Sequence, residues 1–300
     1  MNGATAASAL EQAVALGLPV GLHLNLTEGR PVHPDVPSLL APGSAVMRSK
    51  HQFRTALAAG EVSSADVVKE ALAQWALFAA LHPNKEPPMA FDGHQHVHVL
   101  PGVAEALAGA LAGLAAATRI PAWAGEAVEP LLHLDPERAA FYAAVSQQAQ
   151  AARAVYAAAG IAPLGAVFVG FGLCGRDCTL ERVQAAVAAA TAAAAGGAVE
   201  VMCHPGFRTL PPGEGLSGTE GQQQEQEQEQ EQEALVGGGG APFQPELRQE
   251  RAQAWASSRL SGSGAGCAGC PADSFACSWE REREMAVLLA LRREGINHRN

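Results

Sequence analysis

The chain has 300 residues, of which 48% are hydrophobic and 17% charged, and its formal net charge is -10. This length permits one large (β/α) barrel or two smaller domains with a sizeable buried core. Five glutamates between positions 225 and 233 supply half of the net charge, so the sequence gives no indication of a nucleic-acid partner. No apolar run approaches the ~20 residues of a membrane span, and the N-terminus does not resemble a signal peptide. We therefore expect a cytoplasmic protein with no membrane partner.

Helical and extended patterns alternate along the chain. Because alanine-rich helices form readily but pack thinly, we expect these helices to cover a sheet rather than form a bundle. The fold class predicted from this order is α/β. The expected helices cover residues 4–16, 63–81, 102–116, 136–159 and 180–195, and the expected strands cover 20–26, the residues leading to His94, 118–121, 166–171 and 198–203.

The pattern breaks after position 208. Residues 209–272 contain a Gln/Glu run, a glycine run and a Ser/Gly-rich stretch, none of which can bury much apolar surface. We interpret them as a disordered insertion. Residues 1–208 and 273–300 are then one domain, closed by an amphipathic helix near the C-terminus.

A histidine-rich segment is the strongest functional signal. Residues 91–100 read Phe-Asp-Gly-His-Gln-His-Val-His-Val-Leu, and an extended conformation would place His94, His96 and His98 on one face, with Asp92 beside them. Histidine is the commonest neutral metal ligand near pH 7. A solvated histidine run is the alternative, but the apolar flanks favour a buried strand end. The segment therefore predicts a metal or catalytic site.

Two further histidines lie where strands end. His23 and Asn25 share the polar face of the predicted strand at 20–26, and a charged turn at 27–31 follows directly. His204 ends the strand at 198–203 and precedes a Pro-Gly turn. Because α/β folds place their chemistry at the carboxyl ends of the strands, we expect a shared pocket there.

These segments together resemble the YdjC-like carbohydrate deacetylases, in particular the animal branch of that family. The resemblance extends over residues 1–208 and 273–295. The motifs that carry it are Gly-Leu-His-Leu-Asn-Leu-Thr-Glu-Gly-Arg-Pro around His23, Asp-Gly-His-Gln-His-Val-His-Val-Leu-Pro-Gly-Val from Asp92, Ala-Val-Phe-Val-Gly-Phe-Gly-Leu-Cys-Gly-Arg from Ala166, Cys-His-Pro-Gly from Cys203 and Asp-Ser-Phe-Ala-Cys-Ser-Trp-Glu-Arg from Asp273.

The resemblance implies a distorted (β/α) barrel of the polysaccharide-deacetylase-like type. It also implies a divalent-metal hydrolase that deacetylates N-acetylated sugars of the chitooligosaccharide type. In the family an Asp and two His hold the metal, and by motif position the histidines are His23 and His94. Two histidines with a carboxylate suit zinc, whereas the family is associated with magnesium, so both metals stay open.

The remaining candidates have supporting roles by resemblance. His204 matches the histidine of the family's His-Pro-Gly motif and is expected to transfer a proton or stabilise an oxyanion; a structural strand cap is the alternative. Arg119 resembles an arginine near the substrate, with a surface salt bridge as an equal alternative. The residues expected to orient the ligands or contact substrate, rather than bind the metal, are Asp92, His96, His98, Asn25 and Arg119.

One family motif is missing. Family members open with a buried strand ending in Asp-Asp-Phe-Gly, whose acids supply the third metal ligand and the general base, and no Asp-Asp pair occurs in this sequence. We therefore expect this chain to lack the first strand and helix of the barrel and to be nearly inactive as given. An upstream exon carrying these elements is one explanation. A non-catalytic carbohydrate- or metal-binding protein is the other, and the sequence leaves a homodimer open.

Overall fold

The computed structural model describes residues 1–3, 5–131, 134–174 and 177–204. The chain divides into two compact units, residues 1–169 with 188–201 and residues 170–187 with 202–300. The predicted insertion at 209–272 and the predicted C-terminal helix lie outside the described residues. Among the residues that are described, no helix is both long enough and apolar enough to cross a membrane.

The described elements alternate as predicted. All five expected helices are present, within a few residues of their predicted ends, and α2 is an additional helix that begins with a capping box between Ser49 and Gln52. The α-helices are α1 (Ala6–Ala15), α2 (Lys50–Ala58), α3 (Ser64–Leu81), α4 (Val103–Leu111), α5 (Pro136–Ala158) and α6 (Leu180–Ala193), with short 3₁₀ helices η1 (Pro37–Leu39), η2 (His94–Val99) and η3 (Phe171–Leu173). The strands are β1 (Leu22–Leu24), β2 (Phe91–Gly93), β3 (Ala117–Thr118), β4 (Ala162–Pro163), β5 (Val167–Val169) and β6 (Val199–Val201).

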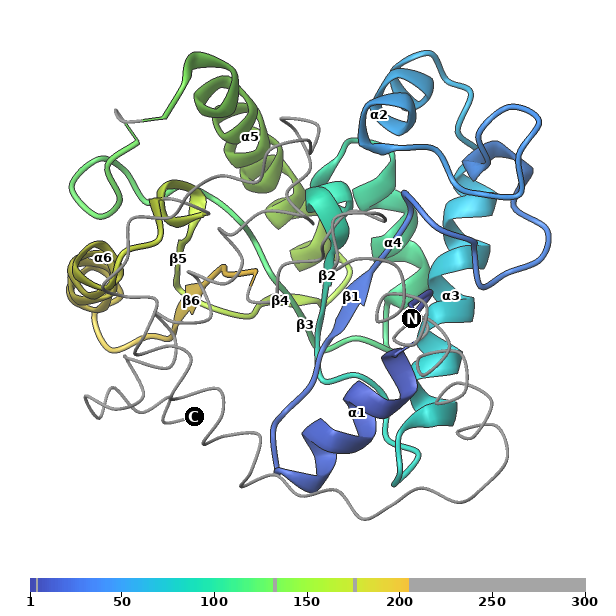
Figure 1. The fold of residues 1–300 in the computed structure, drawn as a ribbon, viewed down its shortest axis with the longest axis horizontal. Coiled ribbons are helices and arrows are strands. Elements are labelled where there is room, and N and C mark those ends of the chain that lie inside the picture. Colours follow the sequence, from blue (N-terminus) through green and yellow to red (C-terminus); the bar gives the residue numbers. More distant parts are fainter. Residues whose placement is uncertain (4, 132–133, 175–176, 205–300) are drawn as a thin grey trace, which may run out of the picture. The chain divides into compact units, whose positions relative to one another are not determined.

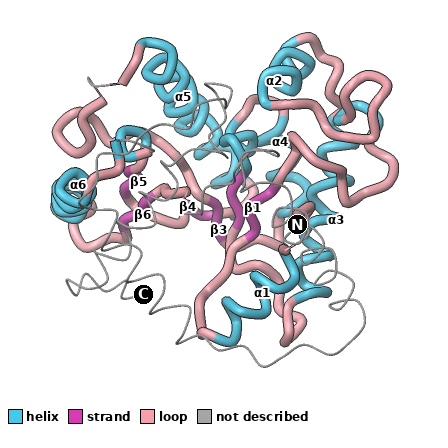
Figure 2. The backbone as a smooth tube through the Cα atoms, viewed as in Figure 1, coloured by secondary structure: helices cyan, strands magenta, loops and turns pink. Residues whose placement is uncertain are grey.

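The strands form two parallel sheets. One has the order β1-β2-β3-β4, and the other pairs β5 with β6 (Figure 1). A single parallel bridge between Trp123 and Phe168 links the segment after β3 to β5. The strands are short, as the magenta segments of Figure 2 show. The predicted α/β class is confirmed, since parallel strands alternate with helices along the chain.

The pairing register of β1 with β2 brings two candidate site residues together. Leu22 pairs with Phe91, and His23 pairs with Asp92, so the carboxyl ends of β1 and β2 lie level. Leu22, Leu24 and Phe91 are buried beneath them. Burying each such side chain contributes about 1.5–3 kcal/mol to folding, which fixes both strands firmly.

A buried polar network holds the segment that follows β1. Gln74 of α3 is fully buried; its Nε2 donates to the Asn25 carbonyl at 2.6 Å and its Oε1 accepts from the Asn25 amide at 3.1 Å. Glu70, one turn earlier, accepts hydrogen bonds from the Val32 and His33 amides at 2.9 and 2.8 Å. Both ends of the turn at 27–31 are therefore tied to the same helix.

The prediction of an extended histidine segment is wrong. The strand ends at Gly93, and the chain turns into η2 through two left-handed residues, Gln95 (φ 54°) and His96 (φ 59°). A Cβ on Gly93 would lie 2.7 Å from the His98 amide nitrogen, which shows how tightly the chain folds back on itself. In this turn Val97, His98 and Val99 are all buried, which a half-exposed strand does not allow.

Candidate functional site

His23 and Asp92 form the centre of the site. The His23 Nδ1 lies 2.7 Å from the Asp92 Oδ1, and 57% of the His23 side chain is exposed. Burial opposes ionisation of Asp92, but the hydrogen bond and electrostatic interaction with His23, together with the Arg119 charge, hold the pKa of Asp92 below its usual range. Because the Asp92 carboxylate is ionised, the His23 Nδ1 donates the proton of this bond. The His23 Nε2 is therefore the ring nitrogen that can bind a ligand.

Arg119, directly after β3, contacts Asp92. Its Nη1 lies 2.9 Å from the Asp92 Oδ2, so both carboxylate oxygens of Asp92 have a partner. On its other side, the Arg119 Nε lies 3.6 Å from the Oε1 of Glu200, a residue of β6. Burial raises the pKa of Glu200, and the nearby Arg119 charge opposes that shift. Arg119 therefore lies between two carboxylates, of which Asp92 is one. The supporting role of Asp92 and Arg119 stays a prediction.

His94 lies next to His23. The two ring centroids are 5.5 Å apart in an edge-to-face arrangement. Burial and the electrostatic interaction with the neighbouring His23 lower the pKa of His94, while the charge of Glu28 opposes the shift. A lowered pKa keeps the imidazole neutral near pH 7, which is the form that binds metal ions. The two histidines predicted as metal ligands are thus neighbours.

Glu28 is a site residue that the sequence analysis did not assign. Its Oε2 lies 3.5 Å from the His94 Nε2. Its Oε1 accepts a hydrogen bond of 2.7 Å from the Gln95 Nε2, and its carbonyl accepts one of 3.1 Å from the Asn25 Nδ2. The charged turn directly after β1 was the signal for this residue, since a loop at the carboxyl end of β1 lies beside the end of β2.

Backbone strain gathers at the same place. Glu28 has a φ of 63°, and Gln95 and His96 are also left-handed, so three of the five non-glycine residues with positive φ in the described chain lie here. Such a conformation costs of order 1–3 kcal/mol and persists only where neighbouring contacts impose it. One contact that holds this turn is the hydrogen bond from the Asn25 Nδ2 to the Glu28 carbonyl.

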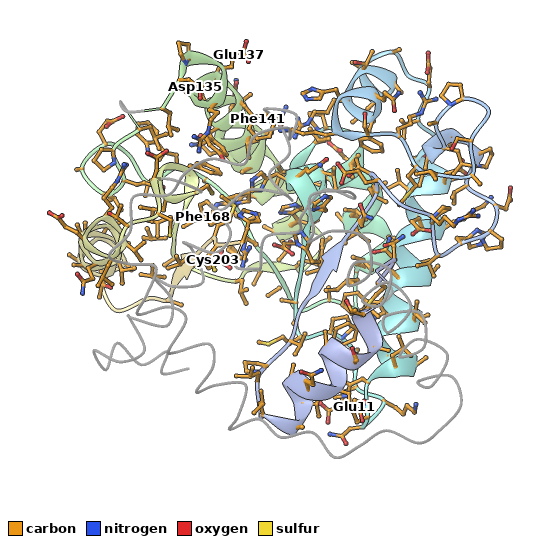
Figure 3. The ribbon with its side chains drawn as sticks, in the orientation of Figure 1. Glu11, Asp135, Glu137, Phe141, Phe168 and Cys203 are labelled. Atoms are coloured by element: carbon orange, nitrogen blue, oxygen red, sulfur yellow. The ribbon has the colours of Figure 1, made fainter. Side chains whose placement is uncertain are left out.

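His96 and His98 have contacts with other parts of the chain. The His96 ring lies 6.5 Å from the ring of Phe141 on α5, which Figure 3 labels. His98 is completely buried, and its Nε2 lies 3.0 Å from the Arg119 carbonyl oxygen. Burial lowers the pKa of His98 to about 4, so the ring is neutral and its Nε2 donates to that carbonyl. That neither residue is a metal ligand stays a prediction.

His204 belongs to the second unit of the chain. There its Nδ1 lies 4.0 Å from the Cys174 Sγ, and the residue is exposed. Its predicted part in proton transfer stays a prediction.

The side chains at the centre of the site, imidazoles and a carboxylate, are of the types that bind divalent metal ions. His94 presents an imidazole whose lowered pKa favours the neutral form, and a carboxylate behind His23 fixes the His23 ring, as is usual for metal-binding histidines. No group of three or more His, Cys, Asp or Glu side chains within residues 1–204, as far as they are described, is arranged to hold a metal ion. The predicted binding of a metal by His23 and His94 stays a prediction.

The fold and site define an α/β protein with a histidine and carboxylate centre at the carboxyl ends of parallel strands. The family model described as YdjC-like protein matches residues 1–248, and the chain belongs to that family. It is 40% identical over 222 residues to the carbohydrate deacetylase of Mus musculus, covering 72% of this chain and 70% of that protein. It is 39% identical over 219 residues to the carbohydrate deacetylase of Homo sapiens, covering 71% of this chain and 66% of that protein. The chitooligosaccharide deacetylase of Serratia marcescens is 38% identical over 102 residues, which cover 34% of this chain and 38% of that protein.

Proposed function

We propose that this protein is a metal-dependent hydrolase that deacetylates N-acetylated sugars of the chitooligosaccharide type. The observation that carries the proposal is the His23 and Asp92 pair, 2.7 Å apart and next to His94, at the level ends of two parallel strands. The names of the similar proteins, which refer to carbohydrate and chitooligosaccharide deacetylation, support the substrate class.

In this proposal the Nε2 of His23 and the ring of His94 hold a zinc or magnesium ion. When bound, such an ion polarises an amide carbonyl and lowers the pKa of a bound water. Asp92 holds His23 in the tautomer that leaves Nε2 available, and Arg119 keeps Asp92 ionised. His204 is the proposed donor of a proton to the leaving amine.

We further infer that the two sheets belong to one distorted (β/α) barrel. The parallel pairing of β1 to β4 and of β5 with β6 supports this inference. So does the bridge between Trp123 and Phe168, because it continues the strand order from one sheet into the next.

One observation favours a second candidate function. The sequence contains no Asp-Asp pair, and in deacetylases of this kind that pair is expected to supply a metal ligand and the general base. Removal of a general base commonly slows a reaction by about 10²- to 10⁴-fold. A protein with this centre but without the Asp-Asp pair would bind an acetylated sugar or a metal without removing the acetyl group.

Acetate release separates the two functions. The deacetylase proposal predicts that the protein releases acetate from N-acetylated chitooligosaccharides and that His94→Ala loses this activity. The matched control is His51→Ala, which removes an exposed histidine of α2. Oligosaccharide binding without acetate release would instead support the binding protein, and equal activity in His94→Ala would contradict the proposed centre.

A further inference from the structure

We infer that Glu28 supplies the third protein ligand, a carboxylate, to the metal centre of His23 and His94. This inference rests on the proposed function, in which those two histidines bind the ion. It assigns a metal-binding role to a residue of the turn after β1.

The distance between Glu28 and His94 fits two ligands of one ion. The Glu28 Oε2 and the His94 Nε2 are 3.5 Å apart, which is too long for a good hydrogen bond. Two nitrogen or oxygen ligands of a tetrahedral zinc, each about 2.0–2.1 Å from the ion, lie about 3.4 Å from one another. The separation already present is that of adjacent ligands.

The other carboxylate near the histidines is already engaged. Asp92 uses one oxygen for the His23 Nδ1 and the other for Arg119. Glu28 has one oxygen on the Gln95 amide and the second directed to His94, and 54% of its side chain is exposed. The Glu28 side chain is therefore the one that can turn toward an ion.

The backbone at Glu28 is built to present this side chain. A left-handed φ of 63° is unfavourable for a glutamate, and glycine is the residue that adopts it without strain. The Glu28 amide donates to the Arg48 carbonyl at 3.0 Å, and Asn25 binds the Glu28 carbonyl. These contacts hold a strained residue in place beside the His94 imidazole, and backbone strain of this kind clusters at ligand sites.

The present side-chain arrangement shows what binding must change. Because no three such side chains in the described residues are arranged around an ion, the Glu28 carboxylate has to rotate to join the histidines. Its exposure permits that rotation. Within the described residues, the hydrogen bond from the Gln95 Nε2 to the Glu28 carboxylate is the one that the rotation must release or share.

Zinc titration of the metal-stripped full chain tests the inference. We expect Glu28→Gln to weaken zinc affinity by at least about tenfold in isothermal titration calorimetry, because it removes a charged ligand of the same size. The control is Glu61→Gln, which neutralises a carboxylate of similar exposure (58%) paired with Arg48, and it should bind zinc like the wild type. Glu28→Gln with wild-type affinity would overturn the inference.

Two more variants separate this inference from the proposed function. If His23→Ala and His94→Ala both bind zinc normally, the histidine centre itself is wrong. If they lose zinc while Glu28→Gln keeps it, only the role of Glu28 is wrong. Gln95→Met is a second test that leaves Glu28 intact but removes the amide that binds its carboxylate. We expect an altered zinc affinity, and an unchanged affinity would count against Glu28 as a ligand.

Discussion

The buried ring of His98 binds the backbone of Arg119: the His98 Nε2 lies 3.0 Å from the Arg119 carbonyl oxygen. That bond fixes the segment after β3, from which the Arg119 guanidinium reaches Asp92 at 2.9 Å. The buried His98 thus helps to determine where the carboxylate behind His23 is held. The His98 carbonyl is fixed in turn by the Tyr156 hydroxyl, which donates a hydrogen bond to it at 2.6 Å.

Arg119→Met should impair the site without removing a ligand. The variant leaves Asp92 with the His23 contact alone, so the orientation of His23 becomes less defined. We expect a loss of about 10- to 100-fold in metal affinity, the usual effect of changing an outer partner of a ligand. Calorimetric titration with zinc measures it, and Arg153→Met, at an exposed position of α5, is the control that should behave like the wild type.

The stability of the protein should fall on mild acidification because of His98. Its folded-state pKa is about 4 and its ordinary value is 6.5, so the unfolded state binds the proton first. This contribution of His98 to the free energy of unfolding, about 3 kcal/mol in all, is fully present above pH 6.5 and is lost progressively toward pH 4. Urea unfolding at several pH values measures this slope. His98→Gln should flatten it, whereas an unchanged slope in that variant would show that other groups are responsible.

Gly93→Ala should destabilise the protein, since the new Cβ would lie 2.7 Å from the His98 amide nitrogen and 2.8 Å from its Nδ1. Overpacking of this kind costs typically about 1–3 kcal/mol. Gly109→Ala is the matched control in α4, where a Cβ meets nothing within 4 Å. There we expect a gain of roughly 0.5–1 kcal/mol. Thermal unfolding of both variants is the measurement, and equal melting temperatures would contradict the described turn.

Glu70→Gln should unfold more easily in urea. The buried Glu70 carboxylate accepts the Val32 and His33 amides, and hydrogen bonds to a charged group contribute about 1.5–3 kcal/mol. Glu11→Gln on α1, at an exposed position labelled in Figure 3, should change stability by less than about 0.5 kcal/mol. A Glu70 variant as stable as the Glu11 variant would mean that the network does not hold the turn.

Sequence patterns predicted the elements well because the patterns are local. The period-two alternation around His23 gave β1, and the helical periods gave the helices from α1 to α6 apart from α2. The family resemblance gave the histidine pair, which the structure places side by side.

The remaining features depend on contacts that no local pattern records. The left-handed Gln95 and His96 turn the chain away from an extended path, so the three histidines of the segment separate. The approach of Glu28 to His94 arises from the pairing of β1 with β2, across 66 residues of sequence. A sequence pattern that shows a charged turn cannot show which neighbour the turn will meet.

Metal dependence of acetate release is the most direct test of the central claim, that His23 and His94 hold the ion of a deacetylase. The protein is stripped with a chelator, and acetate released from N-acetylated chitooligosaccharides is measured before and after zinc or magnesium is restored. The proposal predicts that stripping abolishes release and that one of the two metals restores it in the wild type but not in His94→Ala. Release that survives chelation, or no release with either metal, would contradict it.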